Sequence, residues 1–382
     1  MRNVQKGLVQ AITKPEILNT RACSNTVAPE IFKMSGQSLA AYLGSDSLAR
    51  KPYIEAVAAS VAALAQAALE VRKLTTQGAL NAGFASSRGS ENSDGDIQKD
   101  LDVVADDIFL AAMRNVPIAL YGSEENTGAI LIDPAKPLAL AIDPLDGSSN
   151  IETNVSIGTI FSIMPVTGDP QSDPEQSFLQ PGTGQLAAGY FIYGPQLALV
   201  LTIGAGTKIF IYCSKFDDFI EAYDSVSIPR DASEFAINVS NYRHWEDPIR
   251  SYVDHLFAGS DGPRGKDFNM RWIASLVADC YRIFIRGGVF LYPADKREGY
   301  GSGRLRLVYE ANPIAFLVEQ ADGAATDSVN RILEIKPTSL HQRTPLVFGS
   351  KSKVERVARY HVDPEVLREH SPSFGNSGPF RE

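Results

Sequence analysis

The spacing of apolar residues predicts two long amphipathic helices in the first third of the chain. Residues 52–73 repeat apolar side chains with helical spacing, and Pro52 stands where a first helical turn tolerates proline. A second helical pattern covers 98–114, with apolar residues three and seven positions apart. Residues 75–96, between the two helices, are rich in Gly, Ser and Asn and show no periodicity. Loops of this length are commonly functional or disordered, so we expect a mobile loop here.

After the second helix the apolar runs become shorter and indicate a sheet. Between about 117 and 225 the chain consists mainly of strand-like runs, among them SIGTIFSIMPV, LAAGYFIYG and KIFIYC. From about 226 onward, strands and helices alternate. The elements predicted there are helices at 246–257, 272–286 and 313–321 and strands at 289–293 and 304–310.

This pattern predicts an α/β protein with two domains and two irregular ends. Residues 34–225 are expected to form an N-terminal α+β domain, and residues 226–362 a C-terminal α/β domain. Residues 1–33 are mildly basic and lack the hydrophobic core of a signal peptide, so we expect a disordered extension or a misassigned upstream start codon. The polar segment 363–382 is expected to be a flexible tail.

Composition and charge restrict the classes of function. The 382 residues carry a net charge of −9, which argues against nonspecific nucleic-acid binding because that binding depends on Lys and Arg. The longest apolar run, the alanine-rich segment 56–71, falls short of the roughly 18–20 residues that span a membrane. The three cysteines and five histidines have no metal-ligand or redox spacing. We therefore expect a cytoplasmic protein in which any metal is bound by oxygen.

Carboxylates stand at the ends of three predicted strands, and Asp96 and Asp102 stand on either side of a helix start, which indicates a cation site. In open α/β sheets ligands bind at the carboxyl ends of strands, so we expect these side chains to meet in one cleft. They could not all stay ionised there without cations, which favours two or three Mg²⁺ ions, with Mn²⁺ as the alternative. Such a site suits phosphoryl chemistry, because metals activate water and stabilise the leaving oxygen. The carboxylates are Asp96, Asp102, Glu124, Glu125, Asp143, Asp146 and Glu310.

The stretch DPLDGSSN (143–150) favours a ligand site over ordinary capping. Acidic residues are common in turns, where they cap and solubilise, so each position taken alone could be structural. Here Gly147, Ser148 and Ser149 follow the aspartates and would offer N–H groups and hydroxyls to a phosphate beside a metal. No Walker loop, dinucleotide fingerprint, GxSxG elbow or aspartyl-nucleophile motif is present. We therefore expect direct attack by water.

A basic segment indicates a second anion site. Between Arg264 and Arg306, nine Lys or Arg residues stand against four Asp or Glu, in a chain whose net charge is negative. The segment could be a solvated face, or it could hold a second phosphate through Arg271, Tyr292 and Arg304. A substrate with two phosphates would need both an acidic metal end and a basic holding end.

An ordered series of motifs carries a family resemblance over roughly residues 36–360. The series is GDIQKDLDV, GSEE, DPLDGSSNI, SIGTIFSI, SLVADCYR, GGVFLYP, RLRLVYEANP and HQRTP. With it the chain resembles class I fructose-1,6-bisphosphatases of the bacterial type, within the Mg²⁺-dependent, lithium-sensitive phosphatase superfamily. The resemblance implies a layered αβαβα fold with the active site between its halves. It also implies hydrolysis of the 1-phosphate of fructose 1,6-bisphosphate to fructose 6-phosphate and phosphate.

The resemblance implies roles for the acidic residues. Asp102 and Glu125 would orient and deprotonate the attacking water, and Asp96 would share this catalytic role while helping to hold a third metal ion. The ligands of the catalytic metals would be Glu124, Asp143, the backbone carbonyl of Leu145, Asp146 and Glu310.

It implies substrate contacts as well. The sugar would touch Asp146, and loop 75–96 would close over the metals. Arg271 would reach into a neighbouring subunit's site, which implies a homo-oligomer, a tetramer by resemblance. The 1-phosphate would be held by Gly147, Ser148 and Ser149. The 6-phosphate side would be bound by Asn238, Tyr292 and Arg304.

The sequence also departs from the animal enzymes of this family. Position 304 is Arg where they have Lys, Trp272 replaces a Tyr, and Asn241 stands where a phosphate-contacting Tyr is expected. Their AMP pocket uses a Lys-Tyr pair and an Arg, where this chain has Pro137, Leu138 and Pro165. We therefore expect weak AMP inhibition or none.

Other functions stay open at this point. Sedoheptulose 1,7-bisphosphate could be the substrate, alone or in addition, in gluconeogenesis or in a carbon-fixation (Calvin) cycle. An inositol-phosphate phosphatase would leave the basic segment without a role. A non-catalytic metabolite sensor would be expected to lack a carboxylate, and all seven are present.

Overall fold

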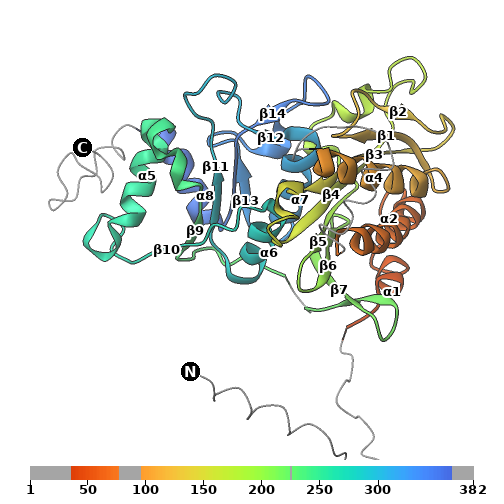
Figure 1. Ribbon diagram of the computed structural model, residues 1–382, viewed down its shortest axis with the longest axis horizontal. Helices are drawn as coiled ribbons and strands as arrows, with labels where there is room; N and C mark the ends of the chain where they lie inside the picture. Colours follow the sequence, from red (N-terminus) through yellow and green to blue (C-terminus); the bar gives the residue numbers. More distant parts are fainter. Residues whose placement is uncertain (1–35, 77–95, 224–225, 364–382) are drawn as a thin grey trace, which may run out of the picture. The chain divides into compact units, whose positions relative to one another are not determined.

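Eight strands form the larger of the two main sheets (Figure 1). The computed structural model describes residues 36–76, 96–223 and 226–363, and side chains before residue 101 in the second long helix are left aside. The strands pair in the order β2-β1-β3-β4-β5-β6-β7-β8, with β1 and β3 parallel and the other neighbours antiparallel. Their bounds are β1 Ile118–Ser123, β2 Ile130–Leu131, β3 Leu138–Asp146, β4 Ile157–Pro165, β5 Ala187–Tyr193, β6 Leu197–Thr202, β7 Thr207–Cys213 and β8 Asp218–Glu221.

Helices cover one face of this sheet and explain its continuous apolar strands. Helices α1 (Leu39–Leu43), α2 (Ile54–Thr75) and α4 (Asp96–Met113) lie together along that face (Figure 1). Strands β1, β3 and β5 are buried along their whole length: α4 packs on β1 and β3, and β5 lies between α2 and the helices α6 (Leu276–Arg286) and α7 (Asn312–Glu319). The two long helices predicted from periodicity are thereby confirmed.

Helix α2 is long and apolar enough to cross a membrane by length and composition, with a mean hydropathy of 1.5. The expectation that no segment reaches this length was therefore wrong. The apolar character of α2 is used in the core instead, because eight of its residues are buried and it packs against α4 and β5. Val57, Val61 and Leu64 on this face are fully buried.

Two further helices lie between the eight-stranded sheet and a smaller one. Helices α6 (Leu276–Arg286) and α7 (Asn312–Glu319) contact β4 and β5 on one side and β15 on the other. The second sheet has the order β10-β9-β11-β15-β13. Its strands are β9 Glu234–Ala236, β10 Asn269–Met270, β11 Val289–Tyr292, β13 Ala324–Thr326 and β15 Leu346–Gly349.

An outer helical layer completes the fold. Helices α5 (Asp247–Phe257) and α8 (Lys351–Val362) pack on each other, and α8 covers β13 and β15 (Figure 1). The order of layers is thus helix, sheet, helix, sheet, helix. This confirms the expected αβαβα arrangement, and the chain is α/β as predicted.

One predicted strand, 304–310, was wrong. Only Leu305–Arg306 is extended, as β12, which pairs with β14 (Arg343–Thr344) in a two-stranded sheet. The chain then forms a π-helical turn at Leu307–Ala311 (η7) that leads directly into α7. A short apolar run fits a buried helical turn as well as a strand, and here the turn is buried throughout.

Several expectations concern residues outside the described ranges. Residues 1–33, nearly all of the predicted loop 75–96 and all but the first residue of the tail 363–382 belong to this group. The domain boundary near 225 also coincides with undescribed residues, 224–225, so the division into two domains stays a prediction.

Candidate active site

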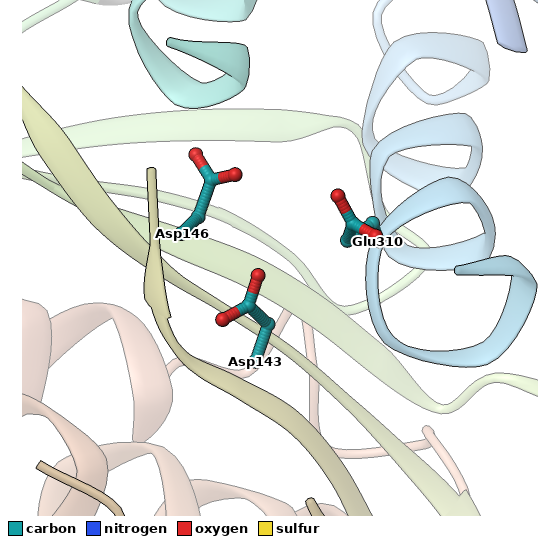
Figure 2. A group of neighbouring side chains, drawn as sticks. All are labelled: Asp143, Asp146 and Glu310. Carbon is teal, nitrogen blue, oxygen red and sulfur yellow. The ribbon is translucent and has the colours of Figure 1, made fainter. Parts of the chain in front are cut away.

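Three buried carboxylates from separate parts of the chain meet between the two sheets. Asp143 and Asp146 stand at the end of β3 and Glu310 on the π-helical turn that precedes α7 (Figure 2). One carboxylate oxygen from each lies within 4.8 Å of the others, and all three side chains are buried. The prediction that Glu310 follows a strand was wrong, but its carboxylate still reaches the predicted partners.

A β-bulge places both aspartates on the same side of β3. Residues three apart on a regular strand point to opposite faces of the sheet. In the pairing with β4, however, Asp143 lies opposite Ile160 and Asp146 opposite Gly158, so the three-residue step on β3 matches a two-residue step on its partner. The extra residue shifts the alternation of side chains by one position. Both aspartates therefore point to the same face of the sheet, and both carboxylates face Glu310.

Each carboxylate of the cluster is held by a backbone N–H group. The N–H of Leu145 donates to Asp143 (3.1 Å). The N–H of Val277 donates to Asp146 (3.3 Å), which places that carboxylate in the first turn of α6. The N–H of Arg306 donates to Glu310 (2.5 Å). These bonds orient the side chains and leave the remaining oxygens available to a cation.

Glu124 joins the cluster because β1 runs parallel to β3. Its N–H donates to the Ile142 carbonyl at 3.1 Å and continues the parallel ladder one residue beyond β1. Its carboxylate accepts a hydrogen bond from the Arg306 guanidinium at 3.0 Å. Its negative charge is among the causes that raise the pKa of Asp143 and of Glu310. Arg306 is a residue that the sequence reasoning missed, although it stands two positions after Arg304 in the motif RLRLVYE.

Asp102 and Glu125 lie beside the cluster. Asp102, on α4, accepts a hydrogen bond from the Ser148 hydroxyl (3.2 Å), while its other carboxylate oxygen is buried without a partner. Burial, and then the charge of Glu125, raises the pKa of Asp102 to about 7. Burial and then the charge of Glu124 raise the pKa of Glu125. Asp102 can therefore bind or release a proton near neutral pH, and Glu125 holds its proton to a higher pH than an ordinary glutamate does.

Electrostatics favour a cation at this cluster. Burial is the first cause of the raised pKa of Asp146, about 7, and it also raises the pKa of Asp143 and Glu310 well above their usual range. Mutual repulsion adds to burial for Asp143 and Glu310, so a divalent cation would relieve both costs at once. Oxygen-only ligands suit hard ions such as Mg²⁺ or Mn²⁺. The residues present therefore fit the metal that the sequence predicted.

The turn that follows the aspartates is short and open. Gly147 has φ +74°, in the left-handed region that favours glycine, and a single 3₁₀ turn (Ser148–Asn150, η2) comes after it. Ser149 is exposed, and the Asn150 amide donates to the Ala274 carbonyl (2.8 Å), which ties the turn to the segment before α6.

A second group of polar and basic residues surrounds Tyr292. Asn238 and Tyr292 line one small pocket together with Arg297. The guanidinium of Arg304 stacks 4.5 Å from the centre of the Tyr300 ring, and its charge acts to lower the pKa of Tyr292, although burial raises that pKa overall. These five residues form one basic, aromatic region.

Among the described site residues, Arg271 is not brought to these groups. Arg271 is exposed, and its described hydrogen bonds are made by its backbone, whose N–H donates to the Phe235 carbonyl and whose carbonyl accepts from Arg282. Asp96 is the first residue of α4, and its side chain lies outside the part of the chain that the structure describes.

Comparisons with known proteins agree with this arrangement. The models of the N-terminal and C-terminal domains of fructose-1,6-bisphosphatase match residues 55–224 and 228–362. A class 1 fructose-1,6-bisphosphatase of Rhizobium meliloti is 61% identical over 91% of this chain and 100% of its own length, and one of Rhodopseudomonas palustris (strain BisB5) is 51% identical over 91% and 99%. The crystal structure of Leishmania major fructose-1,6-bisphosphatase in holo form has a TM-score of 0.76 at 31% identity, covering 86% of this chain and 99% of that one. The chain belongs to the class 1 fructose-1,6-bisphosphatase family.

Proposed function

We propose that this fructose-1,6-bisphosphatase releases the 1-phosphate of its substrate at the cluster of Asp143, Asp146 and Glu310. The activity itself follows from membership of the family. The location is supported above all by the three carboxylates, which are buried within 4.8 Å of one another, while the partly exposed Arg306 guanidinium pairs with Glu124 beside them. A site of this charge fits divalent cations and the phosphate that they attract.

The proposed metal ligands are these three carboxylates, Glu124 and the carbonyl of Leu145, with Asp96 at a third ion. Mg²⁺ is the proposed metal and Mn²⁺ the alternative, because every proposed ligand atom is an oxygen. When bound, such ions supply positive charge that activates water and stabilises the leaving oxygen. The protein's part is to hold the oxygens in place before the substrate arrives.

Asp102 and Glu125 are proposed to move the proton of the attacking water. Both have a raised pKa, and Asp102 keeps one buried oxygen without a hydrogen-bond partner. A carboxylate near its pKa at neutral pH is suited to accept a proton and then release it. Ser148 donates its hydroxyl hydrogen to the other oxygen of Asp102, which fixes the orientation of that side chain.

The substrate is proposed to extend from this cluster to the basic region. The 1-phosphate would meet the backbone N–H groups of Gly147 and Ser148 and the hydroxyl of Ser149, and Asp146 would also touch the sugar. The far phosphate would bind Asn238, Tyr292 and Arg304. Exposed Arg271 is proposed to serve a neighbouring subunit in a homo-oligomer, a tetramer by resemblance, in the cytoplasm.

Phosphate release from fructose 1,6-bisphosphate and sedoheptulose 1,7-bisphosphate, each with Mg²⁺ and with EDTA, tests this proposal. We expect metal-dependent release from the fructose ester, and the ratio of the two rates measures any sedoheptulose activity. Faster release from myo-inositol phosphates would overturn the substrate assignment. An absence of release with every divalent metal would favour the non-catalytic sensor.

A further inference from the structure

Two buried hydroxyl groups, on the neighbouring strands β4 and β5, are hydrogen-bonded in series to the bulge of β3. The Thr159 hydroxyl, on β4, donates to the carbonyl of Pro144 at 2.8 Å. The same Thr159 oxygen lies 2.8 Å from the hydroxyl of Tyr193, at the end of β5. A threonine hydroxyl has one hydrogen, which goes to Pro144, so Tyr193 donates to Thr159. The result is a directed chain of hydrogen bonds from Tyr193 through Thr159 to Pro144.

This chain ends at the point where the sheet pairing is interrupted. Asp143 pairs with Ile160 and Asp146 with Gly158, so Thr159 is the one residue of β4 opposite two residues of β3, Pro144 and Leu145. Proline has no N–H group and cannot restore a ladder bond. The Thr159 side chain supplies the hydrogen bond to the Pro144 carbonyl that ties the bulged segment to β4.

The position of this bond matters for the two aspartates. Pro144 directly follows Asp143 and is two residues before Asp146, and the bulge between them is what turns both carboxylates to the same side. Thr159 is fully buried and Tyr193 is nearly so, so water cannot replace either hydroxyl readily. Without these hydrogen bonds, the Pro144 carbonyl would lose its described partner, and the bulge would be free to shift.

We propose that Thr159 and Tyr193 are positioning residues that set the relative geometry of the Asp143 and Asp146 carboxylates through the carbonyl of Pro144. This inference rests on the proposed function, because it assumes that the two carboxylates bind the cation together. Neither residue is among the proposed metal ligands or substrate contacts. Partners that orient metal ligands typically change metal affinity by about 10–100-fold when they are removed.

The test compares Thr159→Val, Thr159→Ser and Tyr193→Phe by direct Mn²⁺ titration and by the Mg²⁺ dependence of activity. Thr159→Val keeps the shape and removes the hydroxyl, so we expect Mn²⁺ affinity to fall by about tenfold or more, with a smaller change in the KM for substrate. Thr159→Ser keeps the hydroxyl and should stay within about threefold of the unsubstituted protein. Tyr193→Phe leaves the bond to Pro144 in place and should have an intermediate effect.

The order of the hydrogen bonds, from Tyr193 through Thr159 to Pro144, allows a further test. If Tyr193 acts only through Thr159, the double variant should bind Mn²⁺ as weakly as Thr159→Val alone, without an additive loss. Thr202→Val is the matched control, because Thr202 is also fully buried and its hydroxyl donates at 2.8 Å to a carbonyl, that of Gly206 in the turn after β6. This control should lose thermal stability and keep its Mn²⁺ affinity.

Two outcomes overturn the inference, and they are distinguishable. If the unsubstituted protein binds Mn²⁺ but Thr159→Val binds it equally well, or loses affinity no more than Thr202→Val does, the hydroxyl chain is merely structural. If the unsubstituted protein itself binds no Mn²⁺ and shows no metal-dependent activity, the proposed function fails and the inference fails with it. Should Thr159→Val not fold, Tyr193→Phe alone decides, since unchanged Mn²⁺ affinity in that variant contradicts the proposal.

Discussion

The guanidinium of Arg306 lies 3.0 Å from the carboxylate of Glu124, a proposed metal ligand. Its charge acts to lower the pKa of Glu125 and of Glu310, although burial raises both overall. Arg306 is also anchored by a hydrogen bond from its guanidinium to the His341 carbonyl (3.0 Å). The protein thus places one of its own cations against the edge of the acidic cluster, where a metal ion would compete with it for Glu124.

Replacing Arg306 with Met should strengthen the binding of Mn²⁺. A partly exposed ion pair contributes up to about 1 kcal/mol, so we expect affinity to rise by about fivefold in a direct Mn²⁺ titration. Arg331→Met is the control, because it removes an ion pair with Glu319, the last residue of α7. It should leave Mn²⁺ affinity unchanged. A weaker affinity in Arg306→Met would show that Arg306 orients Glu124 and does not compete for it.

The stability of the metal-free protein should fall as pH rises. The pKa of Asp102 and of Asp146 is about 7 in the folded protein, above the ordinary value of 3.8. A raised folded-state pKa contributes stability that is fully present below about pH 4 and is lost as pH rises through about 7. In EDTA, the melting temperature should therefore be lower at pH 8 than at pH 5.5. Mg²⁺ should raise it more at pH 8, because the carboxylates must lose protons to bind the metal.

The control for this pH dependence is Asp146→Asn, which removes one titrating group. In this variant the melting temperature in EDTA should fall less between pH 5.5 and pH 8. If the metal-free protein were instead equally stable or more stable at pH 8, the buried carboxyls would be ionised without a cation. That result would contradict the electrostatic argument for a metal site.

Glu125→Gln should abolish turnover and leave metal binding largely intact. The substitution keeps the shape of the side chain and removes its capacity to take up a proton, which general base catalysis requires. We expect kcat to fall by about 100-fold or more. Glu124→Gln should in addition weaken Mn²⁺ binding, because Glu124 is a proposed ligand. A near-normal kcat in Glu125→Gln would remove Glu125 from the proposed proton-transfer pair.

Tyr300 should assist binding of the second phosphate through its ring. The guanidinium groups of Arg297 and Arg304 lie 3.9 Å and 4.5 Å from the ring centre, and Arg297 is also paired with Asp295. A cation–π contact contributes about 0.5–1 kcal/mol at exposed sites, so Tyr300→Ala should raise the KM for the bisphosphate by about two- to fivefold, with kcat little changed. Tyr300→Phe keeps the ring and should resemble the unsubstituted protein. Equal defects in the two variants would mean that the hydroxyl, and not the ring, is responsible.

AMP should inhibit weakly or not at all through the pocket of the animal enzymes. Leu138 is buried and pairs directly with Pro165 across β3 and β4, and Pro137 precedes them. None of these side chains has a charge or a hydrogen-bond donor for a phosphate or a base. Initial rates at increasing AMP concentration measure this, and half-inhibition at micromolar AMP would contradict the prediction.

Periodicity alone predicted the large elements, because each depends on residues close together in the chain. The long helices α2 and α4 and most strands of the eight-stranded sheet follow from the spacing of apolar side chains over a few turns or a few residues. The carboxylates at the ends of β1 and β3 were also predicted from position, since parallel neighbours bring these ends together. The family could be inferred from motifs that retain their order along the sequence.

The tertiary structure decided what depends on distant residues. The segment 304–310 is mostly a helical turn, because it is buried against α7 and β3, which local apolar spacing does not encode. The bulge in β3 exists only in its pairing with β4, and it is hydrogen-bonded by Thr159 on β4, which in turn contacts Tyr193 on β5. Arg306 meets Glu124 across 182 positions of sequence. Sequence spacing thus determined which groups are available, whereas packing determined which of them touch, because contacts between distant segments arise only when the sheets and helices close around one core.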